Sequence, residues 1–360
     1  MSHRLSAILH NSKYFFKRYC FFKAGVLLLA VTISNTLVAQ PQIKDNFPST
    51  YTVVPGDTLW DISGLYLENP WMWPEIWHVN PQIENPHLIY PGDRLALVYV
   101  EGKPRLVINR SGEVRLSPQL RTSPLGSGIP AIPLEAISPF LSRSRVFDPK
   151  EMDPAPYIIA GPDRRLLTSA GEKIYGRGKL EGEGRMYGIY RRGAIYKDPE
   201  TKEMLGVQAR EIGASRIIRF PNEDDVFTAQ ISSSREEIRV SDRLLPFADQ
   251  DVSATFFPKA PEVDVDGLII GVDGAVASIG RYDVVTLNRG RREGLQEGDV
   301  LTVLRAGERV TDIVEREKVM LPDEEAGLLI VFKVFEKVAY GLVLEASRPL
   351  SLYDKVSNPS

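Results

Sequence analysis

Few side chains in this sequence are of the types that carry out nucleophilic or metal-assisted catalysis. The 360 residues include four histidines and one cysteine. Cys20 and the first two histidines lie in an N-terminal segment that we expect to be removed, so His78 and His87 are the histidines that remain. A Cys–His peptidase then lacks its nucleophile, and a zinc hydrolase lacks a cluster of ligands. The HExxH and GxSxG motifs of metallopeptidases and α/β-hydrolases are also absent from the sequence.

Two other stretches imitate ligand-binding motifs. Residues 262–273 resemble a calcium loop in spacing, but glutamate is a poor first ligand and Pro258 and Pro261 prevent an entering helix, so an acidic lead-in to a strand is favoured. Residues 176–184 are rich in glycine but lack the Ser/Thr and helix of a phosphate-binding loop, which favours a hairpin turn. A glycosidase with two carboxylates stays open as an alternative. We expect no catalytic residues, no metal site and no cofactor.

The residue types suited to binding a sugar are concentrated between Tyr51 and Val100. All four tryptophans lie in this stretch: Trp60, Trp71, Trp73 and Trp77. An aromatic ring can stack on the apolar face of a pyranose, but a module this small also needs bulky side chains inside. We expect Trp60 and Trp77 in the core and the proline-flanked Trp71 and Trp73 to be more open. Six acids and one base in the stretch favour a neutral glycan over a polyanion.

The elements that must position these side chains follow the order strand, helix, helix, strand. Residues 51–54 form the first strand, and residues 94–98 return as the last after a Pro91-Gly92 turn. The first helix is capped by Asp57 or Thr58, and Pro74 begins the second. The side chains expected to face inward are Leu59, Ile62, Leu65 and Tyr66 from the first helix and Ile76, Trp77 and Val79 from the second.

This order, with GDTLW, NP and PGD in these places, resembles a LysM domain. The resemblance implies binding of the N-acetylglucosamine-containing glycan of peptidoglycan or chitin, in a groove between the first strand–helix loop and the second helix–strand loop. The glycan-binding residues that it implies are Gly56, Asp57, Thr58 and Leu59 from the first loop and Asn80, Pro81, Leu88, Ile89 and Tyr90 from the second.

Residues 1–39 have the pattern of an export signal. A basic region is followed by the apolar run 24–38, and Ala39 is the expected cleavage residue, with an uncleaved anchor as the alternative. The segment holds five bases and no acid, so 39 Lys and Arg remain against 47 Asp and Glu, a net charge of −8 that gives no support to nucleic-acid binding. Without cysteine, the exported protein must derive its stability from hydrophobic cores.

The rest of the chain has mainly strand patterns. Residues 103–108 and 113–116 predict a hairpin, and residues 117–156 form a proline-rich linker in which 133–141 dock as a short helical turn. Residues 157–247 and 262–358 repeat one another at an offset of about 110 to 115 positions. In this repeat, Asp242 corresponds to Asp354. The sequence therefore predicts an α+β protein, with a strand–helix–helix–strand module at residues 50–100 and two tandem β domains.

The long tryptophan-rich insert, together with IPLEAISPFLSRSRV, YRRGAIYKDPETKEMLG and SSREEIRVSDRLLP, is similar to one wider family over nearly the full chain. This family is that of the type IV pilus secretin-associated LysM proteins (TsaP-like) of Gram-negative bacteria, whose C-terminal region is similar to that of FlgT. The resemblance implies a non-enzymatic periplasmic protein that binds peptidoglycan and tethers the outer-membrane secretin, with several copies around the ring. The alternative is a LysM-targeted cell-wall enzyme or a general envelope-binding factor.

Overall fold

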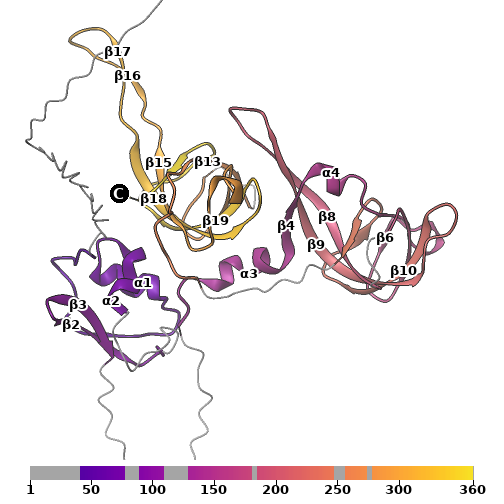
Figure 1. The fold of residues 1–360 in the computed structure, drawn as a ribbon, viewed down its shortest axis with the longest axis horizontal. Coiled ribbons are helices and arrows are strands. Elements are labelled where there is room, and N and C mark those ends of the chain that lie inside the picture. The colour runs from indigo at the N-terminus through magenta and orange to yellow at the C-terminus, as the bar shows by residue number, and fades with distance from the viewer. Residues whose placement is uncertain are drawn as a thin grey trace, which may run out of the picture. The chain divides into compact units, whose positions relative to one another are not determined.

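The computed structural model describes residues 41–77, 89–108, 129–180, 185–246, 256–273 and 278–359 (Figure 1). Pro41–Ser360 form one compact unit. Within the described ranges, every helix is too short or too polar to span a membrane. The export signal, Asn80, Pro81, Leu88, Val79 and the second half of the predicted 103–116 hairpin lie outside the described residues.

The N-terminal module, residues 41–108, has a three-stranded antiparallel sheet in the order β1-β2-β3. β1 is Tyr51–Thr52, β2 is Arg94–Val100 and β3 is Lys103–Ile108. The predicted strand at 103–108 is therefore present, but it pairs with β2 through a turn at Glu101 and Gly102, both of which have positive φ. Glycine adopts this conformation readily, which allows the tight connection.

Two short helices cover this sheet. α1 is Leu59–Tyr66, and the 3₁₀ helix η1, Pro70–Met72, leads directly into α2, Trp73–Trp77. Thr58 is the N-cap of α1, which confirms one of the two capping residues predicted from the sequence. Leu59, Ile62 and Tyr66 are buried as predicted, but the inward placement of Leu65 is wrong, because this side chain is 37% exposed.

Three of the four tryptophans are buried. Trp77 is buried in the module core as predicted, whereas Trp60 is buried outside that core, so its predicted placement is wrong. The expectation of an open Trp73 is also wrong, since it is only 1% exposed. The prolines that flank Trp73 begin helical turns, and these turns direct its indole into the module core with Leu59, Met72 and Ile76. Trp71 alone is half-buried, so the openness predicted for it is partly retained.

After the module, the chain continues into two closed β-barrels of six strands each, which run from β5 to β20. In the first, the strand order is β5-β7-β10-β9-β8-β12, and β10 and β5 bracket β7. Its strands are β5 Tyr157–Ala160, β7 Lys173–Arg177, β8 Met186–Lys197, β9 Met204–Arg219, β10 Val226–Ser234 and β12 Arg243–Pro246. β4, Ser144–Phe147, is added to the outer edge of β9, α4 is Pro149–Met152 and η3 is Pro162–Arg164. β6, Leu167–Thr168, pairs with β11, Ile238–Arg239.

The second barrel has the order β13-β14-β19-β18-β15-β20. Its strands are β13 Asp266–Val272, β14 Val284–Leu287, β15 Val300–Arg305, β18 Glu324–Val334, β19 Ala339–Ala346 and β20 Lys355–Ser357, with η4 at Arg291–Glu293. Between β15 and β18, β16 (Arg309–Thr311) and β17 (Lys318–Met320) extend beyond the barrel strands as a two-stranded ribbon (Figure 1).

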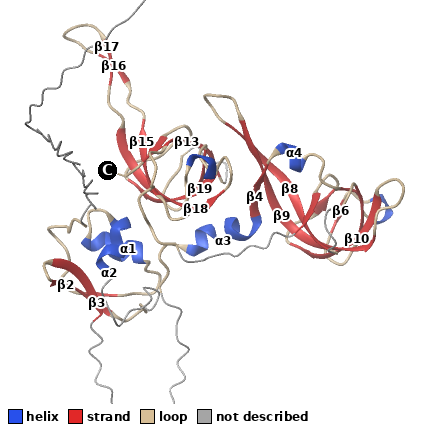
Figure 2. Ribbon diagram, in the orientation of Figure 1, coloured by secondary structure: helices blue, strands red, loops and turns tan. Residues whose placement is uncertain are grey.

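Both barrels place their strands in the same order, counted along the chain as first, second, fifth, fourth, third and sixth. This confirms the predicted pair of tandem β domains, and it extends the prediction, because the sequence did not indicate that the sheets close. Asp242 and Asp354 are equivalent, as each lies directly before the last strand of its barrel and accepts a hydrogen bond from the backbone N–H three residues earlier. Figure 2 shows how strands dominate this part of the chain.

The predicted helical turn in the linker is a helix of ten residues, α3, Leu134–Arg143. The Lys333 ammonium of β18 donates to the carbonyls of Phe140, Leu141 and Ser144 at the end of this helix, at 2.8 to 2.9 Å. On β18 and β19 the side chains of both strand faces are largely buried. One face fills the barrel, and the other packs against α3 and against the β8–β9 hairpin.

Candidate functional site

The predicted glycan site depends on two loops, of which the structure describes the first and the end of the second. Gly56 is exposed, Asp57 and Tyr90 are half-buried, and Thr58, Leu59 and Ile89 are buried. Leu59 and Ile89 both contribute to the core of the module, so the structure brings the two loops together. Asn80, Pro81 and Leu88 belong to residues that the structure does not describe.

Two of the side chains in the first loop organise the loop itself. The Asp57 carboxylate accepts from the backbone N–H of Val54 at 2.8 Å and from the Tyr51 hydroxyl at 2.9 Å. Burial, followed by the bond to Asp57, raises the pKa of the Tyr51 hydroxyl. Thr58 Oγ1 accepts from the backbone N–H of Asp61 at 3.1 Å. Asp57 and Thr58 therefore hold the start of α1 in place through bonds within the loop.

The first backbone N–H groups of α1 have unusual partners. The start of an α-helix leaves N–H groups without acceptors inside the helix. Leu59 N–H donates to the carbonyl of Pro130 at 3.0 Å, and Trp60 N–H donates to the carbonyl of Ala131 at 3.2 Å. On the other loop, the carbonyl of Ile89 accepts from the N–H of Ile129 at 2.8 Å. Residues Ile129–Ile132, which we call the strap, therefore bond to both loops.

The strap was missed by sequence reasoning, which treated residues 117–156 as a linker. Ile129 and Ala131 are 3% and 4% exposed and lie in the core of the N-terminal module. Ile132 is also buried, in the cluster that includes α3 and the second barrel. The available signal was the apolar run Ile129–Ile132, in which each isoleucine precedes a proline. A linker exposed to solvent does not need large apolar side chains.

Comparison with known proteins identifies the module that carries these loops. The family model described as "LysM domain" matches residues 51–97. Residues 51–97 form a LysM domain. The match indicates binding of peptidoglycan or a related carbohydrate.

One curated relative is similar over part of its length. The chain is 40% identical over 60 residues to the "Uncharacterized protein YqbP" of Bacillus subtilis (strain 168), a match covering 14% of this chain and 27% of that protein. The chain thus spans little more than a quarter of this relative.

Helix α1 of the LysM domain also contacts the second barrel. Trp60 packs in a cluster with Ile132, Leu342 and Leu344 rather than in the core of its own domain. The Trp60 indole N–H donates to Glu345 Oε1 at 3.2 Å, and Asp61 forms an ion pair with Arg281. Trp60 is therefore buried by the barrel, and the ring is engaged in protein contacts instead of facing a sugar.

Trp71 is the tryptophan that remains accessible. It lines a hollow with Glu68 and Asn69 of the LysM domain and with Thr302, Glu345 and Ser347 of the second barrel. Among the described residues, no acceptor bonds to the Trp71 indole N–H. The pattern of a half-exposed ring beside carboxylate and amide groups is compatible with sugar contact, which keeps Trp71 as a secondary candidate.

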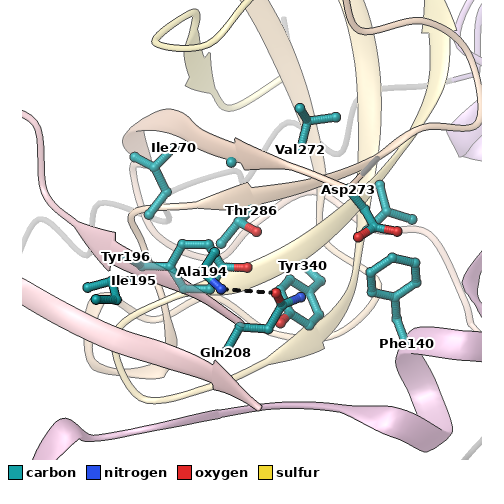
Figure 3. Close-up of a pocket in the computed structure, with 12 residues that line it drawn as sticks. Phe140, Ala194, Ile195, Tyr196, Gln208, Ile270, Val272, Asp273, Thr286 and Tyr340 are labelled. Atoms are coloured by element: carbon teal, nitrogen blue, oxygen red, sulfur yellow. Dashed lines mark hydrogen bonds between the residues drawn. The ribbon is translucent and has the colours of Figure 1, made fainter. Parts of the chain in front are cut away.

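A further pocket lies where the two barrels meet, and its lining comes from α3, β8, β9, β13, β14 and β19 (Figure 3). Its polar groups bond mainly to one another. The Ser144 and Tyr340 hydroxyls lie 2.8 Å apart, and Gln208 Oε1 accepts from the Ala194 N–H at 3.4 Å. Burial raises the pKa of the Tyr340 and Tyr196 hydroxyls, so both stay protonated. Among the described residues that line this pocket, Asp273 is the one carboxylate, so these residues do not supply the carboxylate pair of a glycosidase.

Proposed function

We propose that this protein is a non-enzymatic, peptidoglycan-binding tether of the periplasm. The LysM domain holds the N-acetylglucosamine-containing glycan, and the barrels hold an outer-membrane partner. The observation that carries the glycan end is the LysM match at residues 51–97. The choice of partner, the secretin through which the type IV pilus leaves the cell, rests on the resemblance drawn from the sequence.

The chemistry of the LysM loops supports the glycan end. An N-acetyl group offers one carbonyl acceptor and one N–H donor. In the first loop these groups are the backbone N–H of Leu59 and of Trp60, and in the second loop the carbonyl of Ile89; in the structure all three bond to the strap. Such neutral backbone groups suit a neutral sugar amide. Binding through one small site is weak, and several copies on one ring would raise the effective affinity for a shared wall.

A substitution at Tyr90 tests the glycan end. Its half-buried side chain lies in the second loop, whereas Thr58 is unsuitable because removal of this N-cap costs about 1 kcal/mol of helix stability. We expect Tyr90→Ala to weaken pelleting with purified peptidoglycan about tenfold, about 1.4 kcal/mol. Tyr99→Ala, which truncates a 62% exposed tyrosine of β2 in the same module, is the matched control.

The same peptidoglycan samples test the absence of turnover. Soluble glycan fragments released by the purified protein would support the alternative of a cell-wall enzyme. Equal pelleting of the Tyr90→Ala and wild-type proteins would place the glycan contact elsewhere.

The β16–β17 ribbon offers a contact for the partner end. At its tip, Ile313 and Val314 are 91% and 89% exposed, and Met320, at the other end of the ribbon, is 62% exposed. Adjacent exposed apolar side chains form a small apolar patch, and contiguous apolar patches can mark interaction sites. Acidic and basic residues flank them, from Asp312 to Lys318. A projecting ribbon with an apolar tip is a suitable shape for insertion into a protein partner.

A double substitution tests the partner end. We expect Ile313→Asp with Val314→Asp to reduce co-immunoprecipitation of the secretin at least tenfold while leaving peptidoglycan pelleting unchanged. Because both side chains are exposed, the substitutions cost little folding stability. Leu166→Asp, at a 72% exposed position of the first barrel, is the control. Undiminished secretin capture by the double variant would exclude the ribbon as the contact.

A further inference from the structure

The strap bonds to the same backbone groups that would hold a glycan in the LysM groove. The groups concerned are the N–H of Leu59, the N–H of Trp60 and the carbonyl of Ile89, with strap partners at 3.0, 3.2 and 2.8 Å. The remaining amide in this turn, that of Asp61, is already bonded to Thr58. The groove therefore has no unoccupied amide at the start of α1 among the described residues.

The strap also has the chemistry of the ligand that it displaces. The acetamido group of N-acetylglucosamine is a secondary amide, as is a backbone peptide group, so each presents a carbonyl acceptor and an N–H donor. In the strap, the carbonyls of Pro130 and Ala131 act as the acceptors, and the N–H of Ile129 acts as the donor. A glycan acetamide and the strap cannot bond to the same groups at once.

We propose that the strap is an intramolecular competitor for the LysM groove, so that glycan binding requires its release. This inference rests on the proposed function, since it concerns regulation of the same site. The affinity of a site that is open for only a fraction of the time falls in proportion to that fraction. The strap thus sets how much of the intrinsic affinity for glycan the full protein displays.

The side chains of the strap hold it in the closed position. Ile129 and Ala131 are buried in the LysM core, and Ile132 is buried in the cluster that contains Trp60 and Phe140. The strap leads directly into α3, the end of which is bonded to Lys333 of the second barrel. Anchoring on both sides makes closure intramolecular, and an intramolecular competitor acts at a high effective concentration.

Substitution within the full chain tests the competition. Ile129→Asp places a carboxylate in an apolar core, which disfavours the closed strap. We expect this variant to bind a soluble N-acetylglucosamine hexamer at least tenfold more tightly than wild type in calorimetry. Leu166→Asp makes a comparable apolar-to-carboxylate change at an exposed position and is expected to bind as wild type does. Circular dichroism and tryptophan fluorescence check that the variants are folded.

Hydrogen exchange on the unmodified protein is an independent test. It shows whether the strap and the glycan compete even if Ile129→Asp does not fold. Addition of the hexamer is expected to increase exchange at the Ile129 amide, which loses its acceptor, while the Leu59 and Trp60 amides stay protected by the glycan. Protection of Ile129 that is unchanged or increased in the bound state overturns the competition while leaving glycan binding intact. Failure of every variant to bind the hexamer or peptidoglycan overturns the proposed function and this inference with it.

Discussion

At the scale of single residues, one turn recurs throughout the molecule. A backbone N–H donates to the carboxylate of an Asp three residues later, and the residue before that Asp has positive φ. In the part of the chain that the structure describes, the six examples end at Asp57, Asp93, Asp242, Asp283, Asp299 and Asp354. All but the first are followed at once by a strand. The carboxylate stabilises a backbone conformation that non-glycine residues rarely adopt.

A prediction at the residue scale compares two copies of this turn. Asp242 also binds the Arg191 guanidinium through both carboxylate oxygens, at 2.9 and 3.1 Å, whereas no such ion pair is described for Asp354. We expect Asp242→Asn to lower the free energy of unfolding by about 2–3 kcal/mol, because it removes the charged acceptor of two Arg191 hydrogen bonds and leaves Arg191 with Glu236 and the Glu237 carbonyl. Asp354→Asn is expected to cost about 1 kcal/mol. Denaturant titrations of both variants measure the difference, and equal losses would show that the ion pair adds nothing.

These turns also show what the sequence reveals about single residues. Where glycine occupies the positive-φ position, as in Pro91-Gly92, the turn was predicted from the sequence. At Ser241, Tyr282 and Tyr353 the same conformation is adopted without glycine, so no local signal marks it. The burial of Trp73 was missed for a related reason, since its environment is set by partners distant in the sequence, such as Phe257.

At the scale of elements, the periodicity of apolar residues predicted the helices and most strands. Which of these strands pair with one another was harder to predict from the sequence. The pairing of β3 with β2 was not predicted, because a short apolar strand can pair with either neighbour, and the strand predicted as its partner, 113–116, lies outside the described residues. Barrel closure and the strap depend on contacts between distant segments, which local periodicity does not encode. At the candidate site, the two loops could be predicted from the LysM motif, but the hydrogen bonds between these loops and the strap could not.

The end of α3 provides a test at this scale. Burial lowers the pKa of the Lys333 ammonium to about 8, while its three carbonyl acceptors hold it in place. We expect Lys333→Met to lower the free energy of unfolding at pH 7 by about 1–3 kcal/mol, because three carbonyls lose their donor. Thermal unfolding followed by circular dichroism measures this loss. Lys318→Met, at an exposed position, is the control and should have no effect.

The pH dependence of that difference has a defined sign. The folded-state pKa of Lys333 lies below its unfolded value, so the unfolded chain binds more protons between about pH 8 and pH 10. The contribution of this group to stability is therefore greatest above its unfolded pKa and falls as the pH is lowered to about 8. The stability gap between wild type and Lys333→Met should widen from pH 8 to pH 10, and a constant gap would contradict the lowered pKa.

At the scale of the whole molecule, Trp60 couples the LysM domain to the second barrel. We expect Trp60→Ala to cost about 3–5 kcal/mol, since it removes a large buried side chain. Because this contact lies outside the LysM core, the loss should appear as a separate, earlier unfolding transition of the LysM domain. Hydrogen exchange at increasing denaturant resolves the two transitions. Leu65→Ala, on the exposed side of the same helix, should leave a single transition, and a single transition in Trp60→Ala would refute the coupling.

The shared strand order of the two barrels has a consequence for how the chain folds. Each barrel closes only when its sixth strand, β12 or β20, pairs with its first and third strands. Such long-range closure is slow, and two copies of one topology give each late strand two possible acceptors. Synthesis from the N-terminus resolves this competition, since β12 is available to seal the first barrel before any strand of the second exists. Refolding of the complete denatured chain lacks this order, so strand exchange between the barrels is the misfolding route to which this molecule is most exposed.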